Sequence, residues 1–124
     1  VDNYARDDMR SAARLISMEE REGDLILVPC GESVFGHYYR GTSRVEKYSP
    51  RFIGDEAAAE RLEGQIADYG RIWFVECRPW EVDPEGTMAA VLERETGLLD
   101  RWEFPGIVVT AHSSAGSPGA ESTR

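Results

Sequence analysis

Two runs of four consecutive apolar residues limit the folds open to this chain. They are Leu25-Ile26-Leu27-Val28 and Ile72-Trp73-Phe74-Val75. A run this short that is apolar at every position is typical of a strand covered on both faces of a sheet. Helical patterns precede, separate and follow the two runs, and such alternation favours parallel strands joined by right-handed crossovers. The sequence therefore predicts an α/β fold.

Apolar stripes at helical spacing predict three amphipathic helices. Each begins at an aspartate that can cap it and stops at a glycine: from Asp7 or Asp8 to Gly23, from Asp55 to Gly70, and from Asp83 to Gly97. A shorter helix is expected from Ser33 to Tyr39, and residues 44–48 form a weaker strand pattern. The last strand is expected within 102–109, where Pro105 cannot donate a ladder hydrogen bond and so favours an edge or bulged strand.

These elements predict one small three-layer αβα domain over residues 1–112, with a mainly parallel, Rossmann-like sheet of about four strands. The expected strand order is 44–48, 25–28, 72–75 and 102–109, with helices on both faces. Residues 113–124 contain no large apolar side chain. Such a segment cannot bury enough surface to offset its ordering entropy, so we expect a disordered tail.

Charge and hydropathy exclude some partners. The 124 residues carry 23 acids against 14 bases, a net charge of -9, which disfavours nucleic acid and anionic membrane surfaces. The longest apolar run is far shorter than the roughly 18–20 residues of a membrane span, so no span is expected in this fragment. The chain begins with Val1 rather than Met and lacks a signal-peptide pattern, and we interpret it as an excerpt of a longer protein.

The segment Gly31-Glu32-Ser33-Val34-Phe35-Gly36 follows the first apolar run, where ligand-binding turns are common in α/β folds. A nucleophile elbow needs glycine where this chain has Phe35, and neither the dinucleotide fingerprint nor the P-loop matches. Ser33 is therefore expected to cap a helix. An alternative stays open: a free-standing module that binds a nucleotide or small anion at the strand ends through Gly31, Ser33, His37 and Arg78.

Metal and aromatic sites have weaker support. The two cysteines and two histidines form no C-x-x-C or H-x-x-x-H unit, so neither a metal nor another cofactor is predicted. Trp73 is expected in the core, whereas Trp80 follows the second apolar run and is the tryptophan placed to contact a ligand. Packing of Trp80 against a neighbouring helix is the competing interpretation.

Several short motifs occur together in a recognisable order. They are Asn3-Tyr4-Ala5-Arg6-Asp7-Asp8-Met9-Arg10, then Ala12 to Ile16, Gly23 to Val28, Phe35 to Tyr39, and Tyr69 to Val75. Over residues 3 to about 110 the chain resembles the soluble segment after the last transmembrane helix of GT-C glycosyltransferases of the dolichyl-phosphate-mannose protein mannosyltransferase type. Met9 stands where that family often has Trp, and Pro79-Trp80 has no obvious counterpart.

The resemblance implies a non-catalytic extracytoplasmic domain of a polytopic membrane glycosyltransferase, or of a related membrane protein. The implied partners are the transmembrane domain of the same protein and a glycan or polyprenyl-phosphate-linked sugar, as acceptor or donor. The family's catalytic acid lies in a loop between transmembrane helices that this chain lacks, so the resemblance carries over no catalytic residue.

The two cysteines stand at equivalent positions. Cys30 and Cys77 each lie two residues beyond an apolar tetrad, so register-matched parallel strands bring them to the same sheet edge within about 8 Å of each other. An extracytoplasmic location permits oxidation, while the similar direction of side chains on neighbouring strands opposes the disulfide geometry. Proximity is predicted, and the bond stays open.

Overall fold

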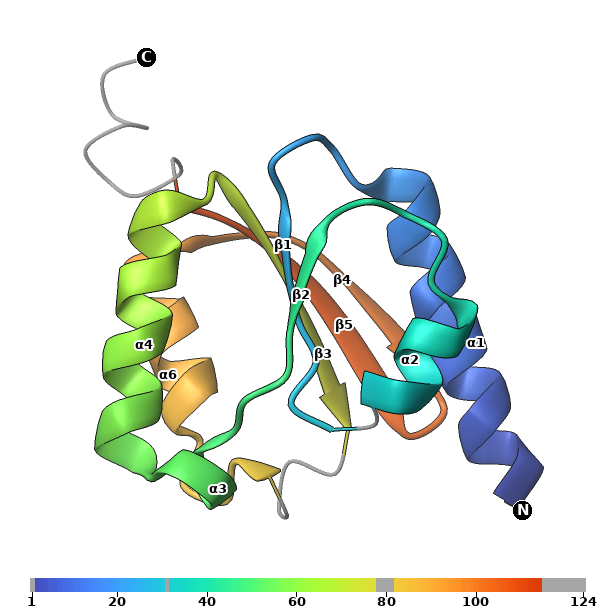
Figure 1. Ribbon diagram of the computed structural model, residues 1–124, viewed down its shortest axis with the longest axis horizontal. Coiled ribbons are helices and arrows are strands. Elements are labelled where there is room, and N and C mark those ends of the chain that lie inside the picture. The colour runs from blue at the N-terminus through green and yellow to red at the C-terminus, as the bar shows by residue number, and fades with distance from the viewer. Residues whose placement is uncertain (1, 31, 78–81, 115–124) are drawn as a thin grey trace.

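A computed structural model describes residues 2–30, 32–77 and 82–114 of the chain (Figure 1). In chain order its elements are α1 (Asp2–Glu19), β1 (Leu25–Leu27), α2 (Glu32–Tyr38), β2 (Arg44–Glu46), α3 (Pro50–Ile53), α4 (Asp55–Asp68), β3 (Arg71–Cys77), α6 (Thr87–Glu95), β4 (Gly97–Phe104) and β5 (Ile107–Ser113). The predicted α/β class is confirmed. The short helix α3 carried no apolar stripe and was not predicted.

The described strands form one five-stranded sheet in the order β2-β1-β3-β5-β4. β1 pairs in parallel with β2 and β3, which confirms the predicted order of these three strands. β5 pairs antiparallel with both β3 and β4. The prediction of about four strands in a mainly parallel sheet is therefore wrong: half of the pairings among these strands are antiparallel.

The difference comes from a hairpin where one strand was expected. Phe104 ends β4 and Ile107 begins β5, so Pro105 and Gly106 form the turn inside the predicted strand 102–109. Gly106 has a φ of 79°, which suits the third residue of a type II turn, and proline is favoured just before it. The proline therefore ends one strand and precedes the next, rather than bulging a single strand.

Helices lie on both faces of the sheet. Figure 1 shows α1 and α2 on one side and α3, α4 and α6 on the other. Consecutive β3 residues serve the two sides: buried Trp73 packs in the cluster under α1 and α2, and buried Phe74 in the cluster under α4 and α6. Trp73 also stacks on Trp102 of β4, with ring centroids 5.5 Å apart. This two-sided burial explains why the strand is apolar at every central position.

The largest differences from the predicted helix starts are in α1 and α6. α1 starts at Asp2 rather than at a cap at Asp7 or Asp8, and Asp8 is buried. α6 starts at Thr87 rather than after Asp83, because Asp83 caps it from a preceding turn. The Asp83 carboxylate accepts hydrogen bonds from the backbone N–H groups of Thr87 at 2.8 Å and Met88 at 3.0 Å. Free N–H groups at a helix start favour such an acceptor.

The described chain extends slightly past the predicted domain end at residue 112. Ser113 pairs with Arg71 in the sheet, and the Ser114 hydroxyl donates to the Tyr69 carbonyl at 2.6 Å. The rest of the predicted tail, residues 115–124, lies outside the described residues. Among the helices that are described, none has the length and apolar character needed to cross a membrane.

Candidate functional site

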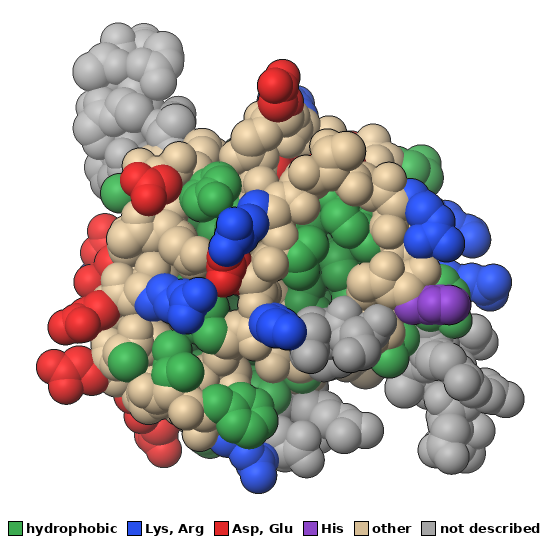
Figure 2. All heavy atoms as spheres, viewed as in Figure 1, with side chains coloured by type: hydrophobic (Ala, Val, Ile, Leu, Met, Phe, Trp, Pro, Cys, Tyr) green, Lys and Arg blue, Asp and Glu red, His purple; other side chains and the backbone are tan. Residues whose placement is uncertain are grey.

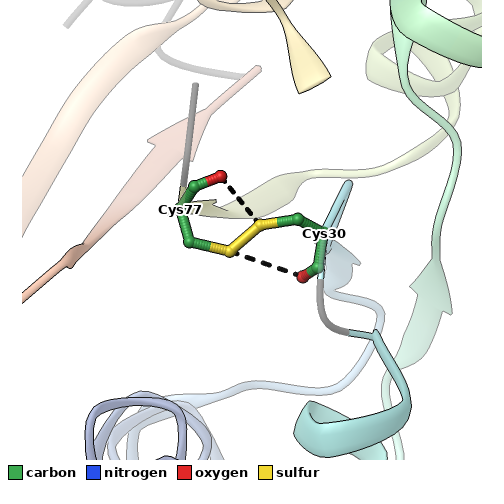
Figure 3. Close-up of a disulfide and its surroundings, with 2 residues drawn as sticks. All are labelled: Cys30 and Cys77. Carbon is green, nitrogen blue, oxygen red and sulfur yellow. Dashed lines mark hydrogen bonds between the residues drawn. A yellow bond between two sulfur atoms is a disulfide. The ribbon is translucent and has the colours of Figure 1, made fainter. Parts of the chain in front are cut away.

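The first candidate region is the sheet edge where β1 and β3 end. Leu25 of β1 is paired with Ile72 of β3, and the register runs evenly, so Cys30 and Cys77 occupy equivalent positions just after and at the end of these strands. Their Cα atoms are 6.3 Å apart, inside the predicted 8 Å, and the two sulfurs are joined as a disulfide (Figure 3). The bond therefore links residues 47 positions apart in the chain.

Both sulfurs also lie against backbone carbonyls across the strand gap. Cys30 Sγ is 2.8 Å from the Cys77 carbonyl oxygen, and Cys77 Sγ is 3.6 Å from that of Cys30 (Figure 3). The pair is thus enclosed between the two chain segments, and both cysteines are only partly exposed. The disulfide holds together the ends of the two central parallel strands.

Of the other residues predicted at this edge, the structure describes Ser33 and His37. Ser33 was predicted to cap α2, but the helix begins at Glu32, so Ser33 lies within its first turn. His37 lies further along α2, is exposed, and contacts Tyr38 ring edge to ring face at 4.8 Å between centroids. The predicted binding residues Gly31, Arg78 and Trp80 fall outside the described residues. The structure therefore brings together the two cysteines of the predicted set.

No metal centre forms within residues 2–30, 32–77 and 82–114. In these ranges no group of three or more His, Cys, Asp or Glu side chains is arranged to hold an ion. Acidic side chains gather along the α4 side of the molecule, while Lys and Arg lie over the middle and the α1 side (Figure 2). The charge separation disfavours an anionic ligand on the α4 side.

A second candidate region is a pocket between α6 and the sheet, which we call the α6 pocket. Its volume is about 360 Å³, at the small end of the range for ligand sites. The lining comes from α6, β3, β5 and β4 and consists of Phe74, Glu76, Ala89, Leu92, Glu93, Thr96, Leu98, Arg101, Thr110 and His112.

Strand alternation explains why these side chains meet. Phe74 of β3 lies opposite Thr110 of β5, which lies opposite Arg101 of β4, and directly opposed residues share a face of the sheet. Two positions along, Glu76 and His112 share that face by the same rule. The opposite faces of these strands pack under α1, so the pocket belongs wholly to the α6 side.

His112 is the most enclosed titratable group of the pocket. Thr96 Oγ1 donates its proton to the Leu92 carbonyl, so it must accept from His112 Nδ1, which lies 3.1 Å away. His112 Nε2 then accepts from the Thr110 hydroxyl at 2.8 Å. Burial lowers the pKa of His112 from 6.5 to about 4, so the ring is neutral at pH 7. Both ring nitrogens are occupied, and the ring ties the end of α6 to β5.

Glu76 differs from His112 because its carboxylate is half-buried and no neighbouring group fully offsets the cost of burying its charge. Burial raises the pKa of its carboxyl, the nearby charge of Asp83 raises it further, and Arg101 lowers it. Arg101 itself pairs with Glu103, its neighbour on the same face of β4. A carboxylate desolvated beside another carboxylate is a common feature of binding and catalytic sites.

The sequence prediction missed this pocket. His112 was assigned no role from the sequence, whereas the residue is buried within β5. The available signal was the alternation Val109-Thr110-Ala111-His112, which places polar residues on one face of a strand and small apolar ones on the other. The hairpin had to be recognised first for that signal to be used.

No protein-family model matches the chain, and no curated protein matches it.

Proposed function

We propose that this chain is a non-catalytic extracytoplasmic domain of a membrane glycosyltransferase, or of a related polytopic membrane protein, with the transmembrane domain of that protein as its partner. The disulfide between Cys30 and Cys77 carries the proposal. Disulfides persist in oxidising compartments and are rare in the cytosol. The resemblance is the basis for placing the domain in a membrane protein, and the disulfide supports its location on the extracytoplasmic side of the membrane.

The arrangement of the α6 pocket supports a binding role over catalysis. His112 uses both ring nitrogens to hold Thr96 and Thr110, which leaves no free nitrogen for general-base chemistry. Glu76 has no second carboxylate or nucleophile paired with it by a hydrogen bond in the described part of the chain. Binding of an acceptor or glycan is therefore the role we assign to the domain.

We also infer that the β2-β1-β3 half is a Rossmann-like unit to which the β4–β5 hairpin is added. Its parallel strands are connected through α2 on one side of the sheet and α4 on the other, as in doubly wound sheets. Ligands of such sheets bind outside the carboxyl ends of the strands. In this chain the disulfide of Cys30 and Cys77 occupies that edge. This favours a structural role for the edge over the alternative function, in which the edge binds a nucleotide or small anion.

Labelling of the full-length protein in intact cells tests the location. Met18 is 73% exposed on α1, so Met18→Cys adds an accessible thiol while Cys30 and Cys77 remain bonded. We expect a membrane-impermeant maleimide to label this variant before the cells are permeabilised. Phe52→Cys, 75% exposed on α3, is the matched second position. Labelling of both variants only after permeabilisation contradicts the extracytoplasmic location.

The alternative function is tested separately by thermal denaturation of the chain with nucleotides, sugar phosphates and inorganic phosphate. A nucleotide or anion module gains stability from its ligand by mass action, which raises Tm by several degrees at saturating ligand. We expect no such shift. A shift with one of these anions favours the alternative.

A further inference from the structure

We propose that the α6 pocket binds an uncharged polyhydroxyl ligand of the size of a sugar residue. The proposal rests on the function proposed above and names the ligand class and the site for its binding role. The pocket joins two kinds of surface: apolar side chains of Phe74, Leu92 and Leu98, and hydrogen-bonding groups of Glu76, Arg101 and Thr110. A sugar ring presents an apolar face of C–H groups and a rim of hydroxyls, so it matches both.

The apolar part of the pocket is open to a ligand. Leu98 lines the pocket and is 59% exposed on the edge strand β4. Val91 and Leu92 of α6 pack in the same cluster as Phe74 of β3, whereas the central residues of β4 are exposed. Covering Leu98 with a sugar's C–H face removes apolar surface from water, at about 25 cal/mol per Å².

The polar part of the pocket disfavours anions and apolar ligands. Glu76 and Glu93 outnumber Arg101 in the lining and repel an anion, whereas a cationic amine is a competing ligand that the titration below includes. An apolar ligand would strip water from Glu76 and Arg101 without replacing the lost hydrogen bonds. A hydroxyl group both donates and accepts, so a polyhydroxyl ligand can serve the carboxylates and the guanidinium together.

The placement of Glu76 is also typical of a binding-site residue. Its carboxylate is half-buried near Asp83, an arrangement that opposes the charged form. A glutamine of the same shape would remove that opposition. Residues that reduce stability in this way are concentrated at functional sites.

Titration of the ¹⁵N-labelled chain with methyl glycosides of mannose, glucose and galactose tests the proposal. We expect amide shift changes at residues lining the α6 pocket for at least one glycoside. Ala89→Phe places a ring in the pocket and is expected to abolish these changes. Ala90→Phe adds the same ring at the next exposed position of α6, which does not line the pocket, and is expected to leave them unchanged.

Three results overturn the proposal: no shift changes with any glycoside at its solubility limit, changes at residues away from the pocket, or changes that persist in Ala89→Phe. Phosphate and methylamine are titrated in parallel, and binding of either in the pocket in place of the glycosides also overturns it. Thermal denaturation of both phenylalanine variants verifies that they fold. The location of the domain is measured independently by maleimide labelling, so failure of sugar binding and failure of the proposed function remain distinguishable.

Discussion

The indole Nε1 of Trp73 donates a hydrogen bond of 2.9 Å to the carboxylate of Asp24, which is only 3% exposed. The same Asp24 oxygen accepts the backbone N–H of Arg21 at 2.9 Å and lies 3.4 Å from the Arg71 guanidinium Nε. Asp24 precedes β1, while Arg71 and Trp73 belong to β3. One buried carboxylate therefore joins the beginnings of the two central strands, at the opposite end from the disulfide.

Replacing this carboxylate should destabilise the fold strongly. In Asp24→Ala the buried Trp73 N–H and the partly buried Arg71 lose their shared acceptor, and we expect a loss of about 3 kcal/mol in the free energy of unfolding. Asp24→Asn keeps an oxygen for Trp73 but loses the charge facing Arg71. Its free energy of unfolding should therefore lie between those of the parent chain and Asp24→Ala. Urea denaturation measures all three. Equal stability of Asp24→Ala and the parent chain contradicts this role.

His112 predicts a loss of stability in mild acid. Its pKa is lowered from 6.5 to about 4 in the folded chain, so between these values the unfolded chain binds a proton that the folded chain does not. Stability therefore falls as pH decreases across this window, at up to about 1.4 kcal/mol per pH unit, and the His112 contribution levels off below the folded pKa.

The acids of the chain also titrate near the lower end of that window, so the His112 contribution needs a matched variant. His112→Gln keeps hydrogen-bonding groups but takes up no proton. We expect the unfolding free energy of His112→Gln to depend less steeply on pH between about 6.5 and 4 than that of the parent. Parallel pH curves for the two chains contradict the prediction, and an NMR titration of the His112 ring reads the pKa directly.

Glu76→Gln should stabilise the chain at pH 7. The pKa of Glu76 is raised on folding, mainly by burial, so the folded state favours the protonated form and loses stability as pH rises through that raised pKa. Glutamine removes the charge, and its benefit should disappear at acidic pH, where Glu76 is protonated in both states. Glu93→Gln, exposed on α6, is the control and should change stability by less than about 0.5 kcal/mol. A Glu76→Gln variant less stable than the parent at pH 7 contradicts the prediction.

Reduction of the disulfide should lower stability without changing the fold. The bond joins residues 47 positions apart, and the chain-entropy model gives about 4 kcal/mol for a loop of that length. We expect dithiothreitol to lower the urea midpoint of the parent and to leave that of a Cys30→Ala/Cys77→Ala variant unchanged. Coincident midpoints for the parent with and without reductant are the opposing result.

The parallel half of the fold could be predicted because its signals are local. The apolar tetrads around Ile26 and Trp73 mark strands buried on both faces, and equal spacing to Cys30 and Cys77 predicts their proximity. The hairpin was not predicted because its outer strand β4 is mostly exposed and carries charged residues, which hide the strand pattern. Pro105-Gly106 is a turn signal, but it was interpreted as an irregularity within one strand.

The α6 pocket could not be predicted because it depends on tertiary pairing. Glu76, Arg101 and His112 come from three strands, and they share a face through the antiparallel register of β5. A one-residue error in that register would send each side chain to the opposite face. Neither the spacing of these residues in the sequence nor their types indicates that they meet.

The thiol state of Cys30 and Cys77 in the full-length protein tests the central claim most directly. Cells are quenched in acid with an alkylating reagent, and the peptides that carry the two cysteines are then analysed by mass spectrometry before and after reduction. We predict that the peptides are disulfide-linked and unalkylated before reduction, as expected in an oxidising extracytoplasmic compartment. Alkylation of both cysteines before reduction would show free thiols in the cell and contradict the account.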